Sequence, residues 1–236
     1  MKTTTKAIVL HLSKYSDKAS VLHTYSRDYG RMSYMVYGIN GKKYRELSAA
    51  TEPFSLVEIE STASVGRDMP TLSKISFDYV QQNTICDIRK RTVAVFIAEI
   101  IYRTMRHPEP DKGLFDFLAS TIHELNDTTE PENYHLSFLL RYTYYLGIMP
   151  AIDETSCMLD IQTGNMRDRL HNTNEEEIVF LKEETEALAG LNEGRSVKIG
   201  RTERQALLDK MCRYYEYHLT DFTRPKSLDI LKEVFD

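Results

Sequence analysis

Tryptophan is absent from the 236-residue sequence, cysteine occurs only three times, and long apolar runs are missing. Cys86, Cys157 and Cys212 lie far apart and are odd in number, which argues against a disulfide framework and fits a reducing compartment. No apolar segment approaches the roughly 18 residues of a membrane-spanning helix. The first residues also lack the apolar run and cleavage site of a signal peptide. We therefore expect a cytoplasmic protein.

The common catalytic motifs are missing as well. The sequence contains no Walker A loop, no GxGxxG, no GxSxG and no HExxH, which excludes the commonest nucleotide-binding and hydrolase signatures. The seven histidines form no pair at a ligand-like spacing, and Cys157 has no second cysteine nearby, so no metal site is predicted. The acidic runs 175–177 and 183–184 are typical of exposed helix faces. We expect a binding protein without a cofactor, rather than an enzyme.

The first 80 residues show the alternation of apolar and polar residues that predicts β-strands. Three short alternating segments lie between Lys6 and Gly41, joined by turn-forming residues at 15–17 and 27–30, and two more follow at 53–60 and 72–80. Five strands joined by short turns predict a small closed barrel. An SH3-like barrel or a two-layer meander fits the periodicity nearly as well.

From residue 81 the apolar spacing becomes helical. Helices are expected over 84–106, 114–125 and 133–146, from a cap at Asn174, from a capping box at Thr202, and over 227–235. We predict a barrel domain over residues 1–80 and an α-helical domain over 81–236. An irregular loop is expected at about 150–173, with a hairpin at Asp160–Met166 turning at Thr163-Gly164.

The candidate binding residues are basic and aromatic. Residues 1–80 carry 11 Lys and Arg against 8 Asp and Glu, whereas the remainder carries 19 against 27. Single strands of nucleic acid are bound by stacking bases on aromatic rings while Lys and Arg follow the phosphates. The candidates for such a site are Arg27, Arg31, Tyr34, Tyr37, Lys42, Lys43, Tyr44 and Arg45, extended by Arg89, Lys90 and Arg91. The alternative for each is a role in the barrel core or in keeping a turn soluble.

A set of motifs follows in a recognisable order. They are Ala7–Leu10, Tyr15–Ser20, Tyr25–Arg31, Pro53–Ile59, Phe138–Tyr142 and Leu146–Pro150. In order and spacing, over nearly the full length, the chain resembles the RecO family of bacterial DNA repair and recombination mediators. The resemblance implies an α+β protein with an N-terminal five-stranded OB-fold β-barrel followed by an α-helical bundle domain.

The same resemblance implies function and partners. It implies binding of single- and double-stranded DNA at the nucleoid, annealing of strands, and assistance in loading RecA onto DNA coated by single-strand binding protein. RecR and the C-terminal tail of single-strand binding protein are the implied partners, and an apolar groove edged by Arg141 is a candidate site for that tail. Many members carry a four-cysteine zinc site after the Leu146–Pro150 motif, but this chain keeps only Cys157 there. We therefore predict no zinc.

Two other functions stay open from the sequence. A protein–protein adaptor whose barrel never contacts nucleic acid is slightly favoured by the net charge of −5. An RNA-binding OB module also fits, because stacking platforms accept RNA and DNA alike.

Overall fold

The computed structural model describes residues 2–37, 48–62, 69–105, 109–152, 158–168, 170 and 173–235. The chain divides into two compact units, residues 1–128 and 129–236, which are described in turn. The predicted basic loop of Lys42, Lys43, Tyr44 and Arg45 lies outside the described residues, as does Cys157. The predicted domain division at residue 80 stays a prediction.

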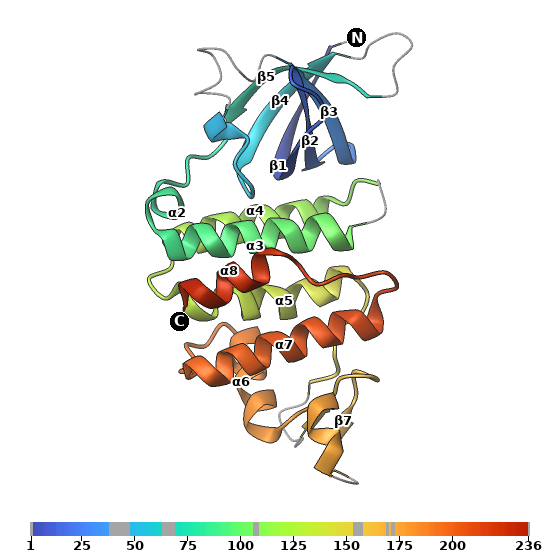
Figure 1. Ribbon diagram of the computed structural model, residues 1–236, viewed down its shortest axis with the longest axis vertical. Helices are drawn as coiled ribbons and strands as arrows, with labels where there is room; N and C mark the ends of the chain where they lie inside the picture. Colours follow the sequence, from blue (N-terminus) through green and yellow to red (C-terminus); the bar gives the residue numbers. More distant parts are fainter. Residues whose placement is uncertain are drawn as a thin grey trace. The chain divides into compact units, whose positions relative to one another are not determined.

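The first unit begins with five strands (Figure 1). They are β1 (Lys2–Lys14), β2 (Ala19–Ser26), β3 (Gly30–Tyr37), β4 (Leu56–Thr62) and β5 (Thr71–Phe77). Their order is β1-β2-β3-β5-β4, and the antiparallel pairing of β1 with β4 closes the sheet. β3 and β5 run parallel and meet through one registered pair, Met35 and Thr71. Five strands in this Greek-key order are what the OB-fold prediction requires.

Alternation along each strand divides the barrel residues between its interior and its outer surface. The interior cluster includes Ala7 and Val9 from β1, Leu22 from β2, and Tyr34 and Val36 from β3. A β-bulge between Val9 and His11 shifts the alternation of β1, so that Leu12 also packs on this cluster. The sheet followed by helices confirms the predicted α+β class.

Three helices complete the first unit: α2 (Gln82–Cys86), α3 (Ile88–Thr104) and α4 (Lys112–Asp127), with α3 and α4 side by side (Figure 1). The single helix expected over 84–106 is therefore wrong in one respect, because it is interrupted at Asp87. This residue is extended, with φ −102° and ψ 115°, and its carboxylate accepts a hydrogen bond from the Arg89 backbone N–H at 2.9 Å. Asp87 thus acts as the N-cap of α3.

The second unit is mainly helical, as predicted. It contains η1 (Pro131–Asn133), α5 (Tyr134–Tyr145), α6 (Lys182–Asn192), α7 (Arg201–His218) and α8 (Ser227–Val234). The expected helix start at Asn174 is wrong, because η2 (Thr173–Ile178) is a 3-10 turn and α6 begins only at Lys182. The capping box expected at Thr202 is displaced. Gly200 precedes α7, and its N–H donates to the Glu203 carboxylate at 3.3 Å.

The region expected to be irregular contains a small sheet. Its strands β6 (Met158–Asp160), β7 (Met166–Arg167) and β8 (Val179–Phe180) lie in the order β7-β6-β8, and the β6–β7 pair confirms the predicted hairpin. The turn passes through Gly164, with φ +70°, at a point where a Cβ atom would lie 2.9 Å from the Tyr214 hydroxyl. Glycine alone avoids both the backbone strain and this close approach.

Candidate nucleic-acid interface

The end of the barrel at the β1–β2 turn brings two exposed tyrosines into one region. The N–H groups of Tyr15 and Ser16 donate to the Ala19 carbonyl at 3.1 and 2.9 Å, and Ala19 is paired across the sheet with Tyr37. Tyr15 is 70% exposed and Tyr37 is 50% exposed. We call residues 14–18 together with Tyr37 the loop end of the barrel. Figure 1 shows the strands that carry it.

Positive charge accompanies these rings. Lys14 and Lys18 are exposed at the same turn, and Lys14 forms an ion pair with Asp17 at 2.9 Å on the surface. The predicted basic residues 42–45 follow Tyr37 in the sequence. In OB-folds, the β1–β2 loop and the neighbouring strands bind oligonucleotides. The loop end therefore has both chemical groups that single-strand binding requires, an accessible aromatic face and cations.

The sequence prediction missed Tyr15, Lys14 and Lys18 as candidates. Their segment was predicted as a turn from its composition, and composition alone does not show which other strands lie beside a turn. The available signal was the antiparallel order of three successive strands, which places the β1–β2 turn beside the last residue of β3.

Arg31 and Arg27, both predicted for DNA, make contacts inside the first unit. Arg31 donates to the carbonyl of Met105, the C-cap of α3, and its guanidinium lies over the Tyr102 ring, with Cζ 4.8 Å from the centroid. Arg27 pairs with Asp116 of α4 at 3.6 Å, and its Nε is buried without a hydrogen-bond partner among the described residues. Both arginines therefore help to connect the barrel to the helices.

The Tyr102 ring lies within an aromatic cluster on the outer barrel face. His11 and His23 stack with ring centroids 6.0 Å apart, and Tyr102 lies 5.3 and 5.2 Å from them. Burial lowers the pKa of His23, with further lowering from His11 and Arg31. Helix α3 therefore covers part of the β1–β2–β3 surface that sequence reasoning left open to a ligand.

Tyr34 and Lys90 are corrections to the predicted site. Tyr34 is 1% exposed within the barrel core, where burial raises the pKa of its hydroxyl to about 12, so its ring cannot stack on a base. Lys90 is 6% exposed, and its Nζ donates to the Asn126 carbonyl at the end of α4 at 2.7 Å. Both residues hold the first unit together.

Arg89 and Arg91 are exposed, as a binding role requires. Arg89 pairs with Asp87 at 3.0 Å, and its side-chain hydrogen bond lowers the pKa of that carboxyl group. Arg91 pairs with Glu52 at 2.9 Å. Ion pairs at such exposed positions are weak, and an incoming phosphate can compete for the guanidinium groups.

Arg141 belongs to the second unit and lies half-buried on α5. Tyr144, one turn further along the helix, is 66% exposed, and Met149 beyond the helix end is 58% exposed. Helix geometry thus places the exposed Tyr144 ring near Arg141, and the role of Arg141 toward a partner stays a prediction.

The residues that the structure describes offer neither a membrane-spanning helix nor a metal-binding cluster. No helix there is long and apolar enough to cross a membrane. Within the same residues, no three His, Cys, Asp or Glu side chains are grouped so as to hold a metal ion.

The fold and the loop end define an α+β protein whose N-terminal barrel belongs to a class that includes oligonucleotide binders. The family model described as Recombination protein O N terminal matches residues 1–78, and the one described as Recombination protein O C terminal matches residues 86–229. The chain belongs to the RecO family.

Curated relatives agree with this membership. The chain is 30% identical over 239 residues to the DNA repair protein RecO of Flavobacterium psychrophilum, with 100% of both chains covered. It is 31% identical over 247 residues to the DNA repair protein RecO of Bacteroides fragilis, with 98% of both chains covered. For the DNA repair protein RecO of Porphyromonas gingivalis the identity is 28% over 242 residues, again with 98% of both covered.

Proposed function

We propose that this protein is a DNA repair and recombination mediator that binds single- and double-stranded DNA at the loop end of its barrel. The observation that carries the proposal is full-length membership of a family whose relatives are named DNA repair proteins. The exposed rings of Tyr15 and Tyr37 beside exposed lysines support this site.

The mechanism is one of binding rather than catalysis. Bases stack on the two tyrosine rings while Lys14, Lys18 and the basic residues 42–45 neutralise phosphates, so contact is nearly independent of sequence. Holding two strands with their charge partly neutralised lowers the repulsion that opposes annealing. Protein and DNA would meet in the cytoplasm, at the nucleoid.

Partners are assigned to the second unit. Residues 129–236 carry 13 Lys and Arg against 20 Asp and Glu, so this unit is less suited to DNA than the first, and an acidic tail would need a local positive charge such as Arg141. We propose that RecR and the acidic tail of single-strand binding protein dock on this protein and that it assists RecA loading with them. An Arg141→Glu variant should bind a tail peptide more weakly, and full retention of tail binding would exclude Arg141.

A protein–protein adaptor without DNA contact is the second candidate. The net charge of −5 favours it, and so does the involvement of Arg27, Arg31 and Lys90 in contacts that hold the first unit together.

Fluorescence anisotropy with a labelled single-stranded oligonucleotide, over a salt series and with EDTA controls, tests the proposal. Affinity should fall steeply with salt and be unchanged by EDTA. Tyr15→Ala and Tyr37→Ala should each weaken binding about tenfold, because one stacked base contributes roughly 1–3 kcal/mol. Replacing Lys42, Lys43 and Arg45 with Ala together should reduce the logarithmic salt slope by about 2.

The matched control is Tyr29→Ala. Tyr29 is 43% exposed in the β2–β3 turn, at the opposite end of the β2 and β3 strands, and its loss should leave affinity unchanged. Equal losses from all three tyrosine variants would rule out the loop end as the site. No binding at low salt would favour the adaptor.

A further inference from the structure

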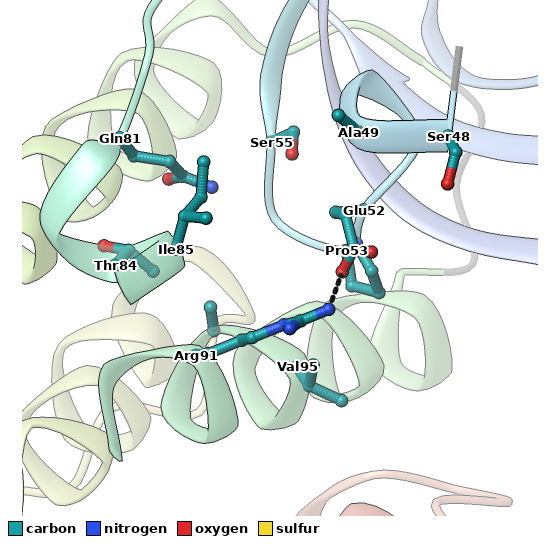
Figure 2. A pocket seen from close by; sticks show the side chains of 11 residues that line it. Ser48, Ala49, Glu52, Pro53, Ser55, Gln81, Thr84, Ile85, Arg91 and Val95 are labelled. Atoms are coloured by element: carbon teal, nitrogen blue, oxygen red, sulfur yellow. Dashed lines mark hydrogen bonds and ion pairs between the residues drawn. The ribbon is translucent and has the colours of Figure 1, made fainter. Parts of the chain in front are cut away.

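A cavity of about 220 Å³ lies within the first unit, apart from the loop end. It is open to solvent on one side and is lined by segment 48–55, which leads into β4, by α2 and by α3 (Figure 2). Its walls are partly apolar, from Pro53, Ile85, Ala94 and Val95. The volume accommodates a single ring system rather than a large ligand.

Two almost fully buried polar side chains face this cavity. Ser55 is 1% exposed, and its hydroxyl points into the cavity without a hydrogen-bond partner among the described residues (Figure 2). Gln81 is 4% exposed; its Nε2 donates to the Phe54 carbonyl at 3.3 Å, but within the same residues its Oε1 accepts no hydrogen bond. Neither oxygen is among the fully buried side-chain atoms of the described residues that lack a partner, so both are accessible from the cavity and can hydrogen-bond to a ligand that enters it.

The backbone holds Ser55 rigidly in this place. Phe54 has a φ of +64°, is fully buried, and donates to the Val9 carbonyl at 2.7 Å, while the Val9 N–H donates to the Ser55 carbonyl at 3.0 Å. A buried non-glycine residue with positive φ marks a local conformation that the surroundings must enforce. The polar wall is therefore preformed.

The guanidinium group of Arg91 places a positive charge at the edge of the cavity. The Arg91 guanidinium lies along one side and uses Nη2 to bind the Glu52 carboxylate at 2.9 Å (Figure 2). The side chain is 50% exposed, and its Nη1 and Nε make no hydrogen bond within the described part of the chain.

These features discriminate between two kinds of ligand. An apolar peptide side chain would fill the cavity but leave Ser55 and Gln81 without partners, which costs binding free energy. A nucleobase has apolar faces for Pro53 and Val95, donors and acceptors on its edge for the polar wall, and a phosphate for Arg91.

We propose that this cavity receives one unstacked nucleobase of a bound single strand, with Arg91 on the adjoining phosphate. The inference rests on the proposed DNA binding and adds a second contact to it. A base in this cavity is held out of the stack and is unavailable for pairing. The strand is thus bound at a second point, separate from the bases that stack on the loop end.

The first test uses the unaltered full-length protein and deoxynucleoside monophosphates, followed by methyl NMR. Addition of thymidine monophosphate should shift the methyl signals of Ile85 and Val95 and leave those of Ile230, an exposed residue of the second unit, unchanged. Shifts caused by N-acetyl-phenylalaninamide but not by any of the four nucleotides would overturn the proposal and assign the cavity to a peptide.

The second test uses variants in oligonucleotide binding. Val95→Phe, at a half-buried wall position, should fill the cavity and weaken binding about tenfold. Ser55→Ala should weaken it about threefold through loss of one hydrogen bond. Ile88→Phe is the matched control, because Ile88 is 65% exposed on the same helix and does not line the cavity.

Outcomes separate this inference from the proposed function. If the unaltered protein binds no oligonucleotide, both fail. If it binds and Val95→Phe binds equally well with an unchanged melting temperature, only the base site fails. A loss in Ile88→Phe equal to that in Val95→Phe would also overturn the base site.

Discussion

At Arg31 a single side chain connects the outer face of the barrel to the end of a helix. Its guanidinium donates to the carbonyl at the C-terminus of α3 and lies over Tyr102. A cation at this position also complements the negative end of the helix dipole. The loss of this side chain should therefore be seen first in stability and only secondarily in DNA affinity.

Arg31→Ala is expected to lower the free energy of unfolding by about 1–3 kcal/mol, the sum of a charge-assisted hydrogen bond and a cation–π contact. Urea denaturation of the full-length protein measures it. Lys18→Ala removes the same charge at an exposed turn position and should leave stability within about 0.5 kcal/mol. Equal stability of the two variants would show that Arg31 does not hold the helix.

His135 gives the second unit a dependence on pH. Its imidazole is 1% exposed on α5, and burial, together with nearby Arg204, lowers its pKa to about 3. The ring is therefore neutral when folded and binds a proton near pH 6.5 when unfolded. This contribution to stability is fully present above pH 6.5 and is lost as the pH falls toward 3.

As the pH falls from 6 to 4, protonation of His135 in the unfolded state should lower the free energy of unfolding by about 1.4 kcal/mol for each pH unit. His135→Leu should remove that part of the slope, whatever its effect on stability at neutral pH. Chemical denaturation at several pH values gives the slope. His11→Gln, at an exposed histidine of the first unit, is the control and should retain it; an unchanged slope in His135→Leu would contradict the assignment.

The tyrosines of β3 show what the sequence can and cannot predict at the scale of residues. The alternation along β3 puts Tyr34 on the same face as Met32 and Val36, so the burial of Tyr34 can be predicted from the pattern. The same alternation puts Tyr37 on the opposite face, where it is exposed. The burial of Lys90 does not follow, because its partner carbonyl at Asn126 is 36 residues away and belongs to another helix. Contacts made by tertiary packing leave no local signal.

At the scale of elements, the β6–β7 hairpin depends on one carboxylate. Asp160 Oδ1 accepts from the N–H groups of Gln162 and Thr163, both at 2.9 Å, and Oδ2 accepts from Arg167 Nη1 at 3.0 Å. The two charged side chains are only 10% and 20% exposed. This network cross-links the turn and both strands of the hairpin.

Asp160→Asn should destabilise the protein by about 2–4 kcal/mol, because the ion pair between Asp160 and Arg167 is lost in a mostly buried position. A double-mutant cycle with Arg167→Met measures the coupling by thermal or chemical unfolding. Glu193→Gln, which breaks the exposed ion pair with Arg195, is the control and should change stability by less than about 1 kcal/mol. A coupling near zero would show that the hairpin is held by other contacts.

Element positions were predicted well and element boundaries less well. Strands and α5 follow from strong periodicity, whereas Asp87 interrupts the first helix by capping α3. The helix predicted to begin at Asn174 does not form there, because Val179 and Phe180 pair with β6 in a sheet built from segments that are distant in the sequence. Patterns within a short window do not report such pairing.

At the scale of the whole molecule, the sequence division and the compact units differ in position. Ile8, Leu10, Val21 and Tyr25 of the barrel are at most 7% exposed, although they alternate with its interior residues. Tyr25 also accepts a hydrogen bond from the Asp111 N–H at 2.9 Å, at the start of α4. The outer barrel face thus belongs to the core of the first unit.

A fragment of residues 1–128 should therefore fold cooperatively, whereas a fragment of residues 1–80 should expose this apolar face and fail to fold or aggregate. Circular dichroism and gel filtration of the two fragments provide the measurement. Cooperative unfolding of the shorter fragment would instead establish residues 1–80 as an independent domain, as the sequence division predicts.

The parallel contact between β3 and β5 is the weakest strand pairing of the barrel among the described residues. Among the described residues, the other four strand pairs are extended antiparallel ladders, whereas β3 and β5 are joined by one registered pair and by the bond from the Met35 N–H to the Pro70 carbonyl. Separating β3 from β5 would break few of the described hydrogen bonds and would leave the four antiparallel ladders intact. We therefore expect strain on the barrel to separate β3 from β5, beside Tyr37, before any of the four antiparallel ladders opens.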